Sequence, residues 1–200
     1  LAAPSTEIMA AWLDGGADAC LTLHHDDDAL LLRLRALLRQ TREPTELRPW
    51  SDGRRLRILA IDDDAIYLDL LCAELEHDTH EVLTALDGET GLRLARLAPF
   101  DCAIIDRRLP GLDGLEVCRQ IAGMRDDTNW FPIAVLTALD DVVDRQVAFE
   151  LGIDEFMLKS DGMTLIRARI AAVIRRRAMV TARWRIARAL AESGAAAAEA

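Results

Sequence analysis

From Leu56 onward, short apolar runs alternate with segments in which apolar residues recur at helical spacing. The apolar runs predict strands at Leu56–Ile61, Glu81–Ala85, Cys102–Asp106, Ile133–Leu136 and Glu155–Leu158. The helical spacing predicts helices at Ala65–Glu76, Gly88–Ala98, Leu115–Gly123, Asp141–Leu151 and from Gly162 onward. Such alternation, with right-handed crossovers, is typical of an α/β fold built on a doubly wound, five-stranded parallel sheet.

The last predicted helix continues past the length that one such domain needs. Positions at spacings of four and three form a seam along it, and the seam consists of Ile166, Ile170, Val173, Arg177, Val180, Trp184 and Ala187. This seam is interrupted only by Arg177 and favours a coiled coil. The helix also carries eight arginines between Arg167 and Arg188, so a nucleic-acid-binding helix and a membrane-surface helix are alternatives.

Residues 1–40 repeat part of the later segment at an offset of 136 residues. Gly16–Asp18 corresponds to Gly152–Asp154, and Arg33–Arg39 corresponds to Arg169–Arg175. The first copy therefore has the length of a helix, a strand and a helix only.

The pattern within this first copy predicts a helix at Thr6–Leu13, a strand near Ala19–Leu23 and a helix at Asp28–Gln40. A linker over residues 41–55 follows, because that stretch carries two prolines and mixed charge without a regular period. Since one strand and two helices have no sheet to complete them, we expect this segment to be disordered or to pair with another chain.

The composition fits a folded protein in a reducing compartment. Of the 200 residues, 51% are apolar, which is ample for a packed core. Four cysteines without C-x-x-C spacing predict buried free thiols, and no apolar run approaches the roughly 20 residues of a membrane span. We therefore expect a cytoplasmic protein that does not enter a membrane. The formal charge of −10 makes binding to nucleic acid an unfavoured function for the chain as a whole.

Acidic residues stand where two of the predicted strands end. The run Cys102–Ile105 ends on Asp106, and the run Leu56–Ile61 ends on Asp62 and Asp63. Because the carboxyl ends of parallel strands meet at one edge of the sheet, these acids are expected to lie together. Their mutual repulsion would be relieved by a divalent cation with a preference for oxygen ligands, which points to Mg²⁺. The next acid, Asp64, is expected to cap the following helix instead.

A hydroxyl and an ammonium group complete this predicted edge. Thr137 follows the fourth strand and Lys159 follows the fifth. Beside a metal-bound carboxylate, these two groups are what a phosphoryl group on that carboxylate needs for its oxygens. The sequence thus predicts a phosphoryl-transfer site with Asp106 at its centre.

With these residues in place, the sequence from Leu56 to about Arg177 resembles the receiver domain of two-component response regulators. The resemblance rests on the acid pair after the first strand, on D-x-x-x-P-x-x-D-G from Asp106 to Gly114, on Thr137 and on Lys159. It implies a flavodoxin-like receiver fold. The sequence departs from the family pattern at Ser160, where the family usually has proline after the lysine.

The resemblance also implies the roles of individual residues. Asp106 would be the phosphoacceptor in a phosphorelay, and Asp62, Asp63, Asp106 and the backbone carbonyl of Arg108 would hold Mg²⁺. Thr137 and Lys159 would hold the phosphoryl oxygens, and Thr137 and Phe156 would be the switch residues. The domain would be a phosphoacceptor signalling module rather than an enzyme.

The resemblance extends to the domain organisation and the partners. Residues 1–40 would be the C-terminal part of a degenerate receiver that lacks the lysine, residues 56–177 an intact receiver, and residues 178–200 a helical extension toward an output domain. A histidine kinase or phosphotransfer protein would donate the phosphoryl group. A homodimer is expected through the C-terminal helix and through the face built from the fourth helix, fifth strand and fifth helix of the receiver.

Three alternatives stay open at this point. The chain could be a receiver scaffold that is never phosphorylated, which Ser160 and the degenerate first copy motivate. It could be the receiver segment of a hybrid histidine kinase or of a diguanylate cyclase. A phosphatase with an aspartyl nucleophile is a further class, although such enzymes generally need a second Asp where this chain has Arg108.

Overall fold

Five parallel strands form a single sheet in the computed structural model, which describes residues 4–20, 27–40, 55–77, 80–125, 130–138 and 142–198. The strand order is β2-β1-β3-β4-β5. The strands are β1 (Arg57–Ile61), β2 (Glu81–Ala85), β3 (Cys102–Asp106), β4 (Ile133–Thr137) and β5 (Glu155–Leu158). The helices around them are α3 (Ala65–His77), α4 (Gly88–Leu97), α5 (Gly114–Ala122), α6 (Val142–Glu150) and α7 (Met163–Ala198), with a 3₁₀ turn at Lys159–Asp161 before α7.

This architecture confirms the predicted α/β fold with its doubly wound, five-stranded parallel sheet and its long C-terminal helix. From Leu56 to the start of α7, each predicted bound lies within one residue of the observed bound.

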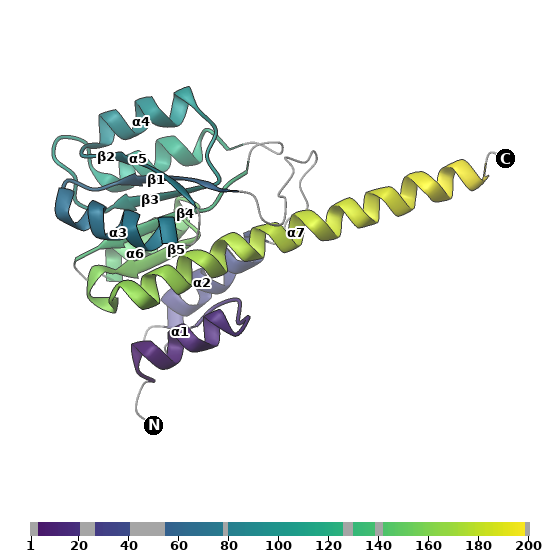
Figure 1. Ribbon diagram of the computed structural model, residues 1–200, viewed down its shortest axis with the longest axis horizontal. Helices are drawn as coiled ribbons and strands as arrows, with labels where there is room; N and C mark the ends of the chain where they lie inside the picture. Colours follow the sequence, from purple (N-terminus) through teal and green to yellow (C-terminus); the bar gives the residue numbers. More distant parts are fainter. Residues whose placement is uncertain are drawn as a thin grey trace.

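Helices cover both faces of the sheet (Figure 1). On one face, Ile61, Ile105 and Val135 belong to a core formed with α4, α5 and α6. On the other face, Ile104 and Leu136 pack with α3 and α7. The central strands β3 and β4 are buried at every position, which explains why their sequences are unbroken apolar runs rather than alternating patterns.

Aspartate side chains determine where several of the helices begin. The Asp64 carboxylate accepts hydrogen bonds from the backbone N–H groups of Ile66 and Tyr67, at 3.0 and 3.1 Å. Asp87 caps α4 in the same way, by accepting from the N–H of Thr90 at 2.7 Å. The prediction that Asp64 is a helix cap is therefore confirmed, and its carboxylate is turned toward its own helix.

Both predicted N-terminal helices are present, as α1 (Thr6–Asp14) and α2 (Asp27–Gln40). They pack on the domain itself, α1 along α7 and α2 against α6 (Figure 1). The expectation that this segment is disordered or pairs with another chain is wrong for the described residues, because α6 and α7 supply the apolar surface that a missing sheet would have supplied. Ala19 and Cys20 belong to no strand, and the rest of the predicted strand Ala19–Leu23 lies outside the described residues.

The face formed by α6, β5 and α7 is covered by these helices of the same chain. The homodimer contact predicted through this face stays a prediction; in this structure α1 and α2 occupy the surface of α7 and α6. The predicted linker over residues 41–55 lies outside the described residues except for Arg55.

Helix α7 runs for 36 residues, and its C-terminal half extends away from the sheet (Figure 1). Ile166, Ile170 and Val173, the first positions of the predicted coiled-coil seam, are buried, and so is Arg177. These positions belong to the predicted receiver, residues 56–177, and their side chains pack within the domain. The coiled-coil extension predicted for residues 178–200 stays a prediction. Val180 is half-buried, and the side chains that follow it lie outside the described part.

Two further predictions concern thiols and membranes. The four cysteines are free; Cys102 and Cys118 are buried, and Cys20 and Cys72 are half-buried. In the described part of the chain, no helix is both long enough and apolar enough to cross a bilayer.

Candidate functional site

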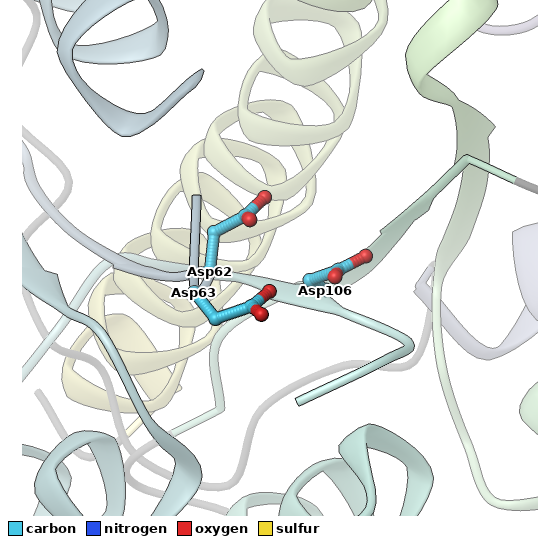
Figure 2. A group of neighbouring side chains, drawn as sticks. All are labelled: Asp62, Asp63 and Asp106. Carbon is cyan, nitrogen blue, oxygen red and sulfur yellow. The ribbon is translucent and has the colours of Figure 1, made fainter. Parts of the chain in front are cut away.

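Three carboxylates from two neighbouring strands meet at the carboxyl edge of the sheet. β1 and β3 pair in parallel with Ile61 beside Ile105, so the acids that follow or close these strands are adjacent. In Asp62, Asp63 and Asp106, one ligand oxygen each lies within 4.8 Å of the others. Figure 2 shows the three side chains gathered at this point. The acidic cluster predicted from the strand ends is therefore present in the structure.

The electrostatics of the cluster favour a cation. Burial, with Lys159 opposing it and the nearby charges of Asp62 and Asp63 adding to it, raises the pKa of Asp106 to about 6. Asp62 and Asp106 are buried, and Asp63 is exposed at the mouth of the cluster. The two buried carboxylates and the exposed one form a set of hard oxygen donors, which suits Mg²⁺.

Lys159 reaches this cluster from the end of β5. Its Nζ lies 2.6 Å from Oδ2 of Asp62 and 3.7 Å from Oδ2 of Asp106. The turn that holds it is the 3₁₀ segment Lys159–Asp161, in which the N–H of Leu158 donates to Asp161 at 3.3 Å. This short turn forms with Ser160 at the position where the family usually has proline.

Thr137 stands on the strand between Asp106 and Lys159. It is the last residue of β4, where its register partner is Leu158, and Asp106 pairs with Leu136. The residue is 1% exposed. Asp106, Thr137 and Lys159 thus follow one another across three successive strand ends.

Phe156 lies on β5, three residues before Lys159. Its side chain is buried in the core that β3 and β4 form with α5 and α6. The guanidinium of Arg145 on α6 lies over the ring, 5.7 Å from its centre. The predicted switch residue therefore connects the strand that carries Lys159 with the helix beside it.

The loop after Asp106 is held close to the strand by Gly114. A Cβ atom at this position would overlap the backbone carbonyl oxygens of Asp106 and Arg107. The N–H of Gly114 donates to the Arg107 carbonyl at 3.2 Å, and Asp113 pairs with the Arg107 side chain. Only glycine permits this approach, which explains the glycine that ends the D-x-x-x-P-x-x-D-G motif. Arg108 lies in this loop with an exposed side chain, two residues beyond Asp106.

Sequence reasoning missed Tyr67. The ring of this α3 residue lies beneath Lys159, whose Nζ is 4.6 Å from the ring centre. Its hydroxyl is buried and has no hydrogen-bond partner in the described parts of the chain. Burial, followed by the charges of Asp62 and Asp106, raises the pKa of Tyr67 to about 12. The available signal was its position, because Tyr67 is the third residue of α3 and so lies in the first helical turn after the acid pair.

Comparison with known proteins supports this arrangement. The Response regulator receiver domain family matches residues 58–171. The chain is 39% identical over 120 residues to the alkaline phosphatase synthesis transcriptional regulatory protein PhoP of Bacillus subtilis, a match that covers 60% of this chain and 49% of that protein.

Two solved structures show the same fold. The first is a CheY-like response regulator receiver domain protein from Methanospirillum hungatei, with a TM-score of 0.58 and 22% identity over 62% of this chain and 97% of that one. The second is the BeF3-activated N-terminal receiver domain of RstA from Klebsiella pneumoniae, with a TM-score of 0.55 and 26% identity over 60% of this chain and 98% of that one.

The chain belongs to the response regulator receiver family, because the family match covers more than half of it. This confirms the resemblance drawn from the strand-end acids, Thr137 and Lys159. Receiver domains of this family are signalling domains of two-component systems. The chain spans about half the length of the curated relatives it matches.

Proposed function

We propose that this receiver accepts a phosphoryl group on Asp106 from a histidine kinase or a phosphotransfer protein. The observation that carries the proposal is the convergence of Asp106 with two other carboxylates and with Lys159 at one edge of the sheet. The chain would act as a phosphoacceptor in signalling rather than as an enzyme with turnover.

In the proposed reaction, a carboxylate oxygen of Asp106 attacks the phosphorus of a phosphohistidine in line with the bond to the imidazole nitrogen. That bond breaks, the histidine leaves with its electron pair, and Asp106 becomes an aspartyl phosphate. At neutral pH a carboxyl group with a pKa of about 6 is mostly ionised, so the attacking form is available.

The surrounding residues have defined roles in this proposal. Asp62, Asp63, Asp106 and the backbone carbonyl of Arg108 would hold Mg²⁺, which supplies positive charge to the phosphoryl oxygens when it is bound. Thr137 donates its hydroxyl hydrogen to one phosphoryl oxygen, and the Lys159 ammonium group pairs with another. Lys159 already lies between Asp62 and Asp106, so a small movement of its Nζ suffices.

The same residues connect the site to the α6–β5–α7 face. When Thr137 and Lys159 are drawn toward the phosphoryl group, the ends of β4 and β5 shift together, and Phe156 adjusts against α6. Phosphorylation then changes the population of the conformations of this face. Thr137 and Phe156 are the switch residues in this scheme.

Helix α7 would pass the change to an output domain that follows it. We propose that two chains pair along α7 beyond Val180, where the predicted seam leaves the domain. The role in transcription belongs to the Bacillus subtilis relative by its name; a regulator of transcription, a hybrid histidine kinase and a diguanylate cyclase are the candidate forms of the whole protein.

Phosphorylation of the full chain by acetyl phosphate tests the site, with intact mass spectrometry as the measurement. We expect wild-type protein to gain one phosphoryl group in the presence of Mg²⁺ and Asp106→Asn to gain none. Asp69→Asn makes the same chemical change on the exposed surface of α3 and should behave like wild type. Labelling of Asp106→Asn at the wild-type rate would refute the assignment, and failure of the wild type to label would favour the scaffold alternative.

A further inference from the structure

The two N-terminal helices correspond in sequence and in extent to the helices on which they pack. Shifted by 136 residues, α1 (Thr6–Asp14) becomes Val142–Glu150, which are the bounds of α6. The same shift places the start of α2, at Asp27, on Met163, where α7 begins. The segment is therefore a second copy of the elements that form the α6–β5–α7 face.

The contacts between the two copies are reciprocal. α1 packs on α7, and α2 packs on α6. Since α1 is the counterpart of α6 and α2 is the counterpart of α7, each of these contacts becomes the other when the copies are exchanged. Such an exchange is the property of a twofold interface between two like subunits. Here both halves belong to one chain.

One half of this interface is apolar. Met9, Ala10 and Leu13 of α1 are buried against α7, and the residues that they meet are Leu165, Ala168 and Ala172. At the C-terminal end of α1, Arg175 donates hydrogen bonds to the carbonyl oxygens of Leu13 and Ala17, at 3.0 and 2.8 Å. Arg175 thus joins α7 to the last turn of α1 and to the turn that follows it.

The other half is centred on Arg33 of α2. Its guanidinium donates to the backbone carbonyl of Asp154 and to the carboxylate of Glu155, and it lies over the ring of Phe149, 5.6 Å from the ring centre. The Arg33 side chain is 8% exposed. Glu155 is also 3.9 Å from Arg176, so two arginines share this buried carboxylate.

This ion pair has no mirror image across the interface. The counterpart of Arg33 is Arg169, which pairs with Asp161 at 3.1 Å, and the counterpart of Glu155 is Ala19. The first copy therefore presents the arginine and the second copy presents the acid. A contact with this division of charge fits the two unlike copies of this chain.

We infer that the α6–β5–α7 face recognises the preceding receiver-like repeat of the same chain, which takes the place of a second receiver there and excludes pairing of two chains through this face. The inference goes beyond the proposed phosphorylation of Asp106 and does not depend on it. Because Arg33 binds the first residue of β5, the repeat contacts the strand that carries Phe156 and leads into Lys159.

Crosslinking of the full chain tests whether the contact forms within one chain. Asp14 and Arg167 form an exposed ion pair across the interface at 3.2 Å, so Asp14→Cys with Arg167→Cys places two accessible thiols there. The half-buried Cys20 and Cys72 are replaced by serine in this background. A short bis-maleimide should join the two positions within a monomer, and the yield should not depend on protein concentration. The pair Asp14→Cys with Arg119→Cys, whose second position lies on α5, is the control and should give no intrachain product.

A second measurement tests the part played by Arg33. Hydrogen exchange of the α2 backbone amides should become at least tenfold faster in Arg33→Ala. The reason is that α2 then loses its buried contacts with Asp154 and Glu155. Arg35→Ala removes an exposed arginine from the same helix and should leave the exchange within twofold of wild type. A crosslink between two chains, no crosslink at all, or equal exchange in Arg33→Ala and Arg35→Ala would overturn the inference.

Discussion

Replacement of Asp106 by asparagine should stabilise the metal-free protein at neutral pH. Burial raises the pKa of Asp106 from 3.8 to about 6, with Asp62 and Asp63 adding to the effect and Lys159 opposing it. A carboxyl group with a higher pKa in the folded state binds its proton more tightly when the chain is folded. Its contribution to stability is therefore complete below about pH 4 and is lost as the pH rises through about 6.

The size of the effect follows from the same pKa. A rise from 3.8 to about 6 corresponds to at most roughly 3 kcal/mol, at about 1.4 kcal/mol for each pH unit. Asparagine removes the charge and keeps the shape, but it also loses the contact of Asp106 with Lys159 at 3.7 Å. Since the cluster is in part open to solvent at Asp63, we expect a net gain of about 1–2 kcal/mol in the free energy of unfolding.

Urea unfolding in EDTA, at several pH values between 4 and 7.5, measures this gain. With a urea dependence of roughly 2 kcal/mol per molar, the midpoint of Asp106→Asn should lie about 0.5–1 M above that of wild type at pH 7.5. The difference should shrink toward pH 4, and it should also shrink when Mg²⁺ is added, because the cation binds the wild-type cluster more tightly. Asp69→Asn should shift the midpoint by less than about 0.25 M. If Asp106→Asn is no more stable than wild type in EDTA at pH 7.5, the charge of Asp106 does not lower the free energy of unfolding of the metal-free protein.

Two further substitutions test the geometry around the site. Gly114→Ala should lower the free energy of unfolding by about 2–4 kcal/mol and slow the labelling of Asp106, because a Cβ atom would overlap two backbone carbonyl oxygens. Thermal unfolding measures the loss of stability. Gly123→Ala is the control: the atom nearest to its added Cβ is 3.4 Å away, and a change under about 1 kcal/mol is expected. Tyr67→Phe removes a buried hydroxyl without a hydrogen-bond partner among the described residues, so urea unfolding should show no loss or a gain of up to about 1 kcal/mol. A clear loss of stability in Tyr67→Phe would mean that the hydroxyl is hydrogen-bonded.

The receiver and its acidic cluster were predictable because their signals are local. Buried parallel strands have unbroken apolar sequences, and in this chain two of them end directly on Asp62 and Asp106. Parallel pairing then brings the ends of adjacent strands together, so the register of β1 and β3 follows from the fold. The turn after Lys159 was the weaker part of the prediction, since Ser160 replaces the family's proline.

The docking of the N-terminal repeat was not predictable from such signals. Arg33 and Glu155 are 122 positions apart, and nothing near either residue marks it as half of a buried ion pair. The apolar side of α2 predicted a helix correctly, but not the surface on which it lies. The pattern of α7 alone could not show where packing on the domain ends, because a helix face that packs on a domain and a coiled-coil seam have nearly equal periods, 3.6 and 3.5 residues.

Because α7 is long, a small tilt of its docked part produces a large displacement of its far end. The helix has 36 residues, and the part beyond Arg177, about 20 residues, is roughly 30 Å long at 1.5 Å per residue. A tilt of about 10° in the docked part would displace the far end by roughly 5 Å, close to the pitch of an α-helix. A small change in how Ile166 and Ile170 pack would therefore become a sideways displacement of roughly 5 Å at the far end of α7.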